Sequence, residues 1–418
     1  MKILIVNTYD NGGAAKASLR LANGLRKRGV KVDFLLKRKI DLTLNTHVLE
    51  LKRTTIFKKY ISKVKRKLKK YNFYQSKYDK FLTERSNNLE LFSLPNSSFD
   101  ITASPLYKEA DIINLHWVSE FLDFSTFFKN NSKPIVWTMH DMNPFSGGEH
   151  YEEIYLGIND NGFPKKRILS TKELSFFEKI KKIKKTALLD VNNLHIVSPS
   201  QWLANKAKES ELFKNMPIHC IANSIDTSIY KPKNIKESKE YFNIPEEKKI
   251  ILFVADSITA NRKGFVFLER AIKSINNKDV VLCVIGKNNL KTNFSNIIEL
   301  GVLKEDHLMS LAYSAADVFV IPSLMDNLPN TVLESLMCGT PVIGFPVGGI
   351  PEMIQNGVNG LITKEISVGA LIETINQFLD NIYKYKREDI FKDAFDKYNL
   401  DIQAKAYENL FKSITEKQ

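Results

Sequence analysis

Residues 322–334 carry side chains that could hold a nucleotide sugar. Asp326 stands in a predicted loop after a strand, and a helix is expected to begin between Pro329 and Thr331, with Glu334 near its first turn. The free amides of a helix N-terminus suit a pyrophosphate, and the two carboxylates can accept hydrogen bonds from vicinal sugar hydroxyls. Ordinary helix capping by Asn330 is the alternative, but it leaves Asp326 unexplained. The predicted donor contacts in this segment are Asp326, Asn327, Leu328, Asn330, Thr331, Val332 and Glu334.

Two adjacent cations form a second candidate. Arg262 and Lys263 follow a predicted strand at residues 250–254 and precede a predicted helix at residues 265–273. At such a junction they could neutralise a leaving diphosphate, whose charge grows as a glycosidic bond breaks. The alternative is that they are solvated charges of a lysine-rich chain. Their position after a strand favours the functional interpretation.

Two further places follow predicted strands. Gly12 and Gly13 stand before the first helix, where missing side chains let a phosphate or sugar approach the backbone; a plain tight turn is the alternative. His140 follows a predicted strand at residues 135–139, where its imidazole could donate to a sugar hydroxyl or could be a structural histidine at a strand end. His116 also follows a strand, but its neighbour Trp117 favours packing.

No metal site is predicted. None of the seven histidines has metal-ligand spacing with another ligand-type residue on one helix face. The cysteines Cys220, Cys283 and Cys338 are far apart and form no Cys-x-x-Cys pair, so they are expected to be free thiols.

The elements that must position these residues are parallel strands. Strand-like runs alternate with helical patterns in both halves of the chain, which is typical of parallel sheets covered by helices. In such sheets, ligands bind beyond the carboxyl ends of the strands. The sequence therefore predicts an α/β fold with two Rossmann-like domains facing each other across a cleft. The expected strands are residues 3–7, 32–36, 111–115, 135–139 and 194–198 in the first half, and 250–254, 280–285, 318–321 and 341–345 in the second.

A length of 418 residues favours two domains, because one hydrophobic core rarely keeps growing to that size. The predicted boundary gives an acceptor domain at residues 1–222 and a nucleotide-sugar donor domain at residues 223–398. A last amphipathic helix at residues 399–414 could pack back on the first domain. The apolar run within residues 1–7 is interpreted as a strand, and no run approaches the roughly 20 apolar residues of a membrane span. We expect a cytoplasmic protein.

The net charge of +14 attracts anions, and part of it is concentrated in one segment. Residues 52–71 contain ten basic and no acidic side chains, while apolar residues recur at spacings of four and three. A helix there would suit an anionic membrane surface, and packing of its apolar stripe on the first domain is the alternative. Nucleic acid is not expected as a partner. The predicted membrane contacts are Lys58, Lys59, Lys63, Lys65, Arg66, Lys67, Lys69 and Lys70.

With these residues in place, the chain resembles the retaining glycosyltransferases of family 4, of group 1 type, especially those that build capsular, exopolysaccharide or lipopolysaccharide chains in bacteria. The resemblance covers nearly the full length. Its most specific part is the pair Asp326 and Glu334, spaced as in the family's Glu-x7-Glu motif. Similar segments are residues 12–15, 138–142, 144–148, 198–200, 223–226, 262–264, 338–343 and 348–352.

The resemblance implies the two-domain fold called GT-B, a metal-independent hexosyl transfer, and retention of the anomeric configuration. The donor would be a UDP- or GDP-linked sugar, with no other cofactor, and the acceptor a glycan or a lipid-linked glycan. Lys263 would then stabilise the diphosphate and Glu334 would hold the ribose. Asp326 would contact the donor sugar, and His140 would lie near the reacting sugar.

The chain departs from the family pattern in three places. Asp326 stands where the family usually has glutamate, so the choice of donor is open. Ser257 occupies the place of an arginine that many members carry before the lysine, leaving Arg262 as the substitute. The loop after Gly147 and Gly148 lacks the cysteines of a related subgroup.

Rival interpretations remain at this stage. A sugar-nucleotide epimerase of the same fold would share the donor without transferring the sugar. A non-catalytic protein that binds a membrane or nucleic acid would explain the charge but not the ordered candidate residues. A nicotinamide-dependent oxidoreductase is weaker, because neither glycine pair completes the dinucleotide fingerprint.

Overall fold

The computed structural model describes residues 1–50, 77–85, 89–152, 154–275, 277–287, 294 and 296–416. The basic segment at residues 52–71, and with it every predicted membrane contact from Lys58 to Lys70, lies outside the described residues. Within the described part of the chain, no helix is both long and apolar enough to span a bilayer.

The first half of the chain folds around a parallel sheet in the order β3-β2-β1-β4-β5-β8-β9. Alternate residues of β1 serve its two faces: Ile3 and Ile5 belong to one hydrophobic cluster, and Leu4 and Val6 to the other. The strands are β1 (Lys2–Tyr9), β2 (Lys31–Arg38), β3 (His47–Val48), β4 (Ile112–Leu115), β5 (Ile135–Thr138), β8 (Leu194–Ser198) and β9 (Ile218–Cys220). The helices of this half are α1 (Gly13–Lys27), α3 (Lys77–Glu84), η1 (Ile101–Ala103), α4 (Pro105–Glu109), α5 (Phe124–Asn130), α6 (Thr171–Leu188) and α7 (Gln201–Glu209).

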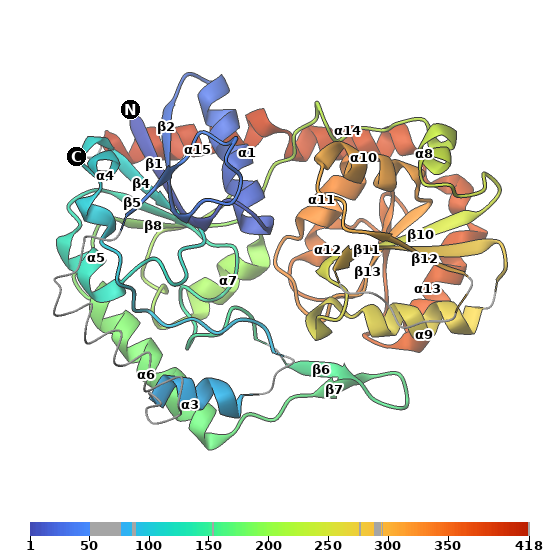
Figure 1. Ribbon diagram of the computed structural model, residues 1–418, viewed down its shortest axis with the longest axis horizontal. Helices are drawn as coiled ribbons and strands as arrows, with labels where there is room; N and C mark the ends of the chain where they lie inside the picture. The colour runs from blue at the N-terminus through green and yellow to red at the C-terminus, as the bar shows by residue number, and fades with distance from the viewer. Residues whose placement is uncertain are drawn as a thin grey trace.

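The second half folds around another parallel sheet (Figure 1). The strand order is β12-β11-β10-β13-β14-β15, and the buried side chains form one hydrophobic core. Its strands are β10 (Lys249–Ser257), β11 (Val280–Lys287), β12 (Ile297–Gly301), β13 (Val318–Ile321), β14 (Val342–Gly344) and β15 (Gly360–Ile362). Its helices are α8 (Ile235–Tyr241), η2 (Asn261–Lys263), α9 (Phe265–Ile275), α10 (Asp306–Ala315), α11 (Asn330–Met337), α12 (Ile350–Met353), α13 (Val368–Asp380), η3 (Ile382–Lys384) and α14 (Arg387–Tyr398). The predicted α/β fold with two Rossmann-like sheets is confirmed.

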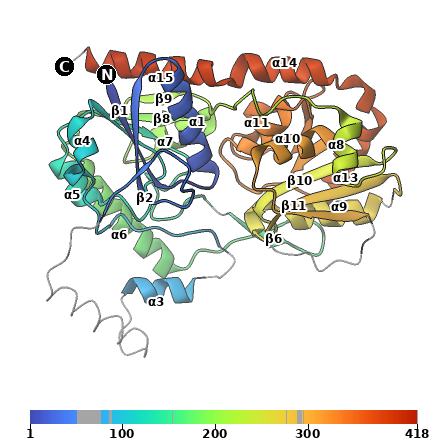
Figure 2. The same ribbon diagram turned by 45° about the horizontal axis from the view of Figure 1, so that its top comes forward.

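The last helix, α15 (Leu400–Thr415), returns from the second sheet to the first, as Figure 2 shows. It packs along α1, and its buried side chains Tyr407 and Phe411 join the same hydrophobic cluster as Ile3 and Ile5. The hydroxyl of Tyr407 lies 2.9 Å from that of Thr138, at the end of β5. The helix therefore covers one face of the first sheet.

A second connection between the two halves is a hairpin of β6 (Tyr155–Ile158) and β7 (Pro164–Lys166), which the sequence did not predict. It leaves the first half and lies against α9 and η2 of the second (Figure 1). The carbonyl of Gly162 accepts a hydrogen bond from the amide of Val368 at 2.9 Å, and the carbonyl of Asn159 accepts one from Arg270 at 3.1 Å. The hairpin thus ties the first half to the elements beside Lys263.

Candidate functional site

The predicted site residues lie where the carboxyl ends of the two sheets meet. Asn327, after β13, donates from Nδ2 to the carbonyl of His140 at 3.3 Å, and its Oδ1 accepts from the Ser200 hydroxyl at 2.5 Å. Asn330, at the start of α11, donates to the carbonyl of Gly13 at 3.0 Å. Loops of one half therefore contact loops of the other at the residues that the sequence singled out.

Asp326 is buried between the two predicted cations. Its Oδ2 lies 2.6 Å from Lys263 Nζ and 3.3 Å from Arg262 Nη1. Burial opposes ionisation of Asp326, but the two cations outweigh it and lower the pKa of the carboxyl below its usual value. Burial also lowers the pKa of Lys263, against the attraction of Asp326. An anionic ligand at Lys263 would either displace the Asp326 carboxylate from the ammonium group or bind the ammonium group beside it.

Two glycines allow neighbouring backbone segments to approach each other closely at these loops. A β-carbon on Gly264, whose φ is 67°, would collide with the carbonyl oxygen of Pro322. A β-carbon on Gly348, whose φ is 58°, would collide with the backbone of Asp326. Both positions combine a left-handed backbone with a close approach, so a side chain is excluded on two grounds. They fix the loops that carry Lys263 and Asp326 against each other.

Arg262 is held largely from the first half of the chain. Its guanidinium lies 4.2 Å from the centre of the Tyr151 ring, and its Nε lies 2.9 Å from Glu90 Oε1. Its Nη1 also donates to the carbonyl of Met325 at 2.9 Å. The structure therefore places Arg262 as a link between the halves, beside Lys263 rather than as a free cation. Sequence reasoning did not identify Glu90 or Tyr151.

Glu334 is buried on α11 and pairs with an arginine that sequence reasoning missed. Arg20 Nη2, from α1, lies 2.9 Å from Glu334 Oε1, and the hydroxyl of Tyr313 lies 3.3 Å from Glu334 Oε2. The Arg20 side chain also lies 5.4 Å from the ring of Tyr230. Its Nη1 is buried and has no hydrogen-bond partner among the described residues. The one signal in the sequence was its helical position, seven residues after Gly13 and so on the same side two turns later.

The other predicted contacts on α11 divide by burial. Leu328 and Val332 are buried in the core of the second half, and Thr331 is half-buried. The helix has no side chain capping its N-terminus, where Pro329 is the cap residue. Gly12 and Gly13 stand at the equally uncapped start of α1. Two helix N-termini without side-chain caps therefore lie near the interface between the halves.

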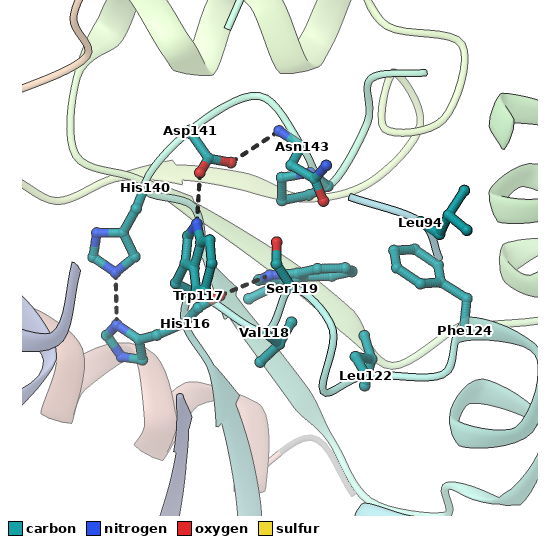
Figure 3. A pocket seen from close by; sticks show the side chains of 12 residues that line it. Leu94, His116, Trp117, Val118, Ser119, Leu122, Phe124, His140, Asp141 and Asn143 are labelled. Atoms are coloured by element: carbon teal, nitrogen blue, oxygen red, sulfur yellow. Dashed lines mark hydrogen bonds between the residues drawn. The ribbon is translucent and has the colours of Figure 1, made fainter. Parts of the chain in front are cut away.

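His140 belongs to a buried polar group in the first half. Its Nε2 lies 2.9 Å from His116 Nδ1, and the two rings lie edge to edge with their centroids 5.2 Å apart (Figure 3). Asp141 accepts from Trp117 Nε1 at 2.8 Å and lies 2.6 Å from His150 Nδ1. Burial lowers the pKa of His140 to about 4, although Asp141 acts in the opposite direction. His116, expected mainly to pack beside Trp117, instead hydrogen-bonds to the candidate histidine.

His116, Trp117, His140 and Asp141 line a small pocket in the first half, which Figure 3 shows from close by. Its lining also includes the polar residues Ser119 and Asn143 and the aromatic residue Phe124. Within the described residues, no group of three or more histidine, cysteine or acidic side chains could hold a metal ion. The three cysteines are free.

Comparison with known proteins decides the family of the second half. Residues 248–381 match the sequence profile described as glycosyl transferases group 1. The chain contains a group 1 glycosyltransferase domain. An uncharacterized glycosyltransferase of Methanocaldococcus jannaschii is 28% identical over 182 residues, which is 40% of this chain and 46% of that protein. The N-acetyl-alpha-D-glucosaminyl L-malate synthase of Bacillus anthracis is 24% identical over 230 residues, 52% of this chain and 58% of that protein. The chain thus spans about half the length of these curated relatives.

The whole chain has the GT-B fold of the glycosyltransferases. The Anabaena protein HepE, solved in complex with UDP and glucose, superposes with a TM-score of 0.66 at 15% identity, covering 99% of this chain and 100% of that one. Within the present chain, the glycosyltransferase domain supplies Arg262, Lys263, Asp326 and Glu334. His140 comes from the other half.

Proposed function

We propose that this protein transfers a hexosyl group from a UDP- or GDP-linked sugar to a glycan or lipid-linked acceptor, with retention of configuration and without a metal ion. The observation that carries the proposal is that two contacts join the halves at these residues: Asn327, next to the Lys263–Asp326 pair, donates to the His140 carbonyl, and Glu334 pairs with Arg20. The HepE structure with UDP and glucose supports a nucleotide sugar as the donor of a protein with this fold.

The donor diphosphate would bind at Lys263 and the uncapped start of α11. Its negative charge would take over the role that Asp326 now has beside Lys263, at 2.6 Å. Buried cations attract an anion more strongly than solvated ones, because little water screens them. Asp326, once released, could accept hydrogen bonds from the donor sugar. In the proposed complex, the contact between Lys263 and Asp326 is thus replaced by contacts of both side chains with the donor.

The ribose would bind at Glu334. Each carboxylate oxygen can accept more than one hydrogen bond, so Glu334 can receive a ribose hydroxyl while it keeps Arg20 and Tyr313. The orphan Nη1 of Arg20 offers a further donor at the same place. We therefore add Arg20 to the proposed donor site.

Front-side attack is the mechanism that these contacts favour. Both oxygens of Asp141 are engaged, by Asn143 N on one side and by Trp117 and His150 on the other. Asp326 lies 3.3 Å from Arg262 and, once released from Lys263, is assigned to the hydroxyls of the donor sugar. A covalent intermediate would need one of these carboxylates as nucleophile. Instead, the bond from the anomeric carbon to the diphosphate breaks, the acceptor oxygen attacks from the same face, and its proton passes to the departing diphosphate.

Product analysis tests the proposal. The protein is incubated with UDP- and GDP-hexoses and with glycan acceptors, and the anomeric coupling of any product is read by NMR. We expect a product with the donor's configuration, formed equally well with excess chelator. Inversion would contradict the mechanism, and activity that vanishes in chelator and returns with magnesium or manganese would contradict metal independence. A product formed from the donor alone would indicate an epimerase.

The cellular setting that we propose is the synthesis of a bacterial surface polysaccharide at the cytoplasmic face of the plasma membrane. The support is the basic, periodically apolar sequence of residues 52–71, since each cation near an anionic surface contributes on the order of 1 kcal/mol. The protein should sediment with vesicles that contain anionic lipid at low salt. Changing Lys65, Arg66, Lys67, Lys69 and Lys70 to glutamate should abolish sedimentation and spare transfer to a soluble acceptor. Equal sedimentation of both proteins would reject the membrane contact.

A further inference from the structure

Three polar side chains form a continuous hydrogen-bonded line in the first half of the chain. Asn114 stands on β4, His116 directly after that strand, and His140 after the neighbouring strand β5. Asn114 Oδ1 lies 3.0 Å from His116 Nε2, and His116 Nδ1 lies 2.9 Å from His140 Nε2. Asn114 and His116 are buried, and His140, which Figure 3 shows bonded to His116, is at the end of the line. The carbonyl of His140 accepts a hydrogen bond from Asn327 of the other half.

The direction of the first hydrogen bond follows from Asn114. Its Nδ2 lies 2.9 Å from the carbonyl oxygen of Val136 and 3.0 Å from Thr138 Oγ1. A backbone carbonyl can only accept, so the amide nitrogen must point to Val136 and the amide oxygen to His116. An amide oxygen also can only accept. His116 therefore carries a proton on Nε2.

The direction of the second hydrogen bond follows from the first. Burial, with a smaller contribution from His140, lowers the pKa of His116 well below its usual value, so the ring is neutral near neutral pH. A neutral imidazole with its proton on Nε2 has a lone pair on Nδ1. His140 must then donate its own Nε2 proton to His116, which leaves the lone pair of His140 on Nδ1. No described residue hydrogen-bonds to that Nδ1.

We propose that Asn114 and His116 are positioning residues that fix His140 as a hydrogen-bond acceptor for a hydroxyl group of the substrate sugar. The inference rests on the proposed function and reverses the expectation that His140 donates. It also gives the site a preference. A sugar with an O–H at this position is accepted, whereas a deoxy, fluoro or carboxylate substituent there offers no proton to the lone pair and is disfavoured.

Protonation of His116 would invert the line. An imidazolium at His116 donates from both nitrogens, so neutral His140 would accept a hydrogen bond at Nε2 and would adopt the other tautomer, with its proton on Nδ1, facing the substrate as a donor. Other titratable groups surround the pair: Asp141 on the same loop, His150 and Lys184 around Asp141, and Tyr407 bonded to Thr138. Asn327, which approaches from the other half, is uncharged. The wild-type line should hold its direction until the pH falls well below neutrality.

Asn114→Asp is the variant that separates this account from a purely structural role. A carboxylate beside His116 Nε2 stabilises the imidazolium, so it should raise the pKa of His116 and invert the line at a higher pH. The acid limb of the transfer rate should move upward by about one pH unit or more, the size of shift that an adjacent opposite charge produces. Asn114→Leu removes the fixed acceptor without adding charge and is the matched control, with thermal unfolding as the check on folding.

The test combines two readouts on the full chain. Protein labelled with 15N at histidine is examined by NMR near neutral pH, with His116→Gln and His140→Gln for assignment. We expect both rings neutral and protonated at Nε2, and an Nδ1-protonated or charged His140 would overturn the inference. In the second readout, transfer from UDP-glucose or the GDP-hexose found active is followed against pH. An unshifted acid limb in Asn114→Asp would overturn the role of the line in the reaction. If the wild type transfers no sugar, the proposed function fails, while the NMR result still decides the tautomers.

Discussion

The guanidinium of Arg20 lies 2.9 Å from the carboxylate of Glu334, and the two residues belong to opposite halves of the chain. Both side chains are nearly inaccessible, with 8% and 6% of their surface exposed. If one partner of a buried charge pair is removed, the other is left as an uncompensated charge away from water, which destabilises the fold. This pair therefore fastens the first helix to the donor-binding helix α11.

Breaking the pair should be costly. We expect Arg20→Met to lower the free energy of unfolding by about 3 kcal/mol, since it leaves Glu334 buried without its cation. Lys16→Met is the matched control on the same helix, because Lys16 and Asp306 form a pair that is 41% and 30% exposed and should contribute less than about 1 kcal/mol. Urea denaturation of both variants measures the difference. Equal losses would show that burial of the Arg20 pair has no special weight.

Lys263 should be needed for turnover. Lys263→Met keeps most of the side-chain volume but removes the charge that would stabilise the departing diphosphate, and we expect the rate of transfer to fall about 100-fold or more. Lys273→Met, on the exposed side of α9 beside Glu269, is the control and should leave the rate unchanged. Steady-state kinetics with a saturating acceptor give the comparison. A wild-type rate in Lys263→Met would remove this residue from the mechanism.

The substitution Asp326→Asn should lower the stability of the protein but increase its stabilisation by UDP. Asp326 stands in a loop, but the structure buries its carboxylate against two cations. The variant leaves Lys263 and Arg262 without a full counter-charge, so its melting temperature should fall. UDP should then stabilise Asp326→Asn more than the wild type, because the diphosphate no longer competes with the carboxylate. Equal stabilisation by UDP would contradict the exchange of anions at Lys263.

The buried Lys184 should make stability depend on pH. Its Nζ donates to the carbonyls of Asn143 and Ser146, beneath the loop of His140. Burial lowers the pKa of Lys184 to about 7, against an ordinary value of 10.5. Between these values the unfolded chain binds a proton that the folded chain does not, so the free energy of unfolding should rise with pH by up to about 1.4 kcal/mol per unit.

Unfolding experiments at several pH values between neutral and about pH 10 measure this slope. Lys184→Met should lack the contribution, while Lys185→Met, whose side chain is exposed, should keep it. A slope that is the same in wild type and Lys184→Met would contradict the depressed pKa.

The sheets could be predicted from the sequence because their central strands are continuous apolar runs. Each expected strand is present, with small shifts at its ends. The missed strands β9, β12 and β15 are short or partly exposed, and the β6–β7 hairpin contains polar residues that give no period-two pattern. A two-residue edge strand such as β3 leaves no pattern to detect.

The site residues that directly follow strands could be predicted from the sequence. The residues that reach the site from the other half of the chain could not. Lys263 and Asp326 follow neighbouring strands of one sheet, so parallel topology alone brings them together. Arg20, Glu90 and Tyr151 reach the site only through the packing of one half on the other, which no local pattern encodes. The role of His116 depended on a hydrogen bond to His140 that is equally invisible in the sequence.

Nucleotide-sugar binding tests the central claim most directly. Thermal unfolding of the wild type is followed with increasing UDP-glucose and GDP-hexose, because a ligand at about 100 times its dissociation constant adds about 2.7 kcal/mol to the stability of the folded state. We predict that one of these nucleotide sugars stabilises the wild type and Lys273→Met. Lys263→Met and Glu334→Gln should need at least about a tenfold higher concentration of that nucleotide sugar to reach the same stabilisation. If no nucleotide sugar stabilises the wild type, or if all four proteins respond alike, the assignment of this site to a sugar-nucleotide donor is wrong.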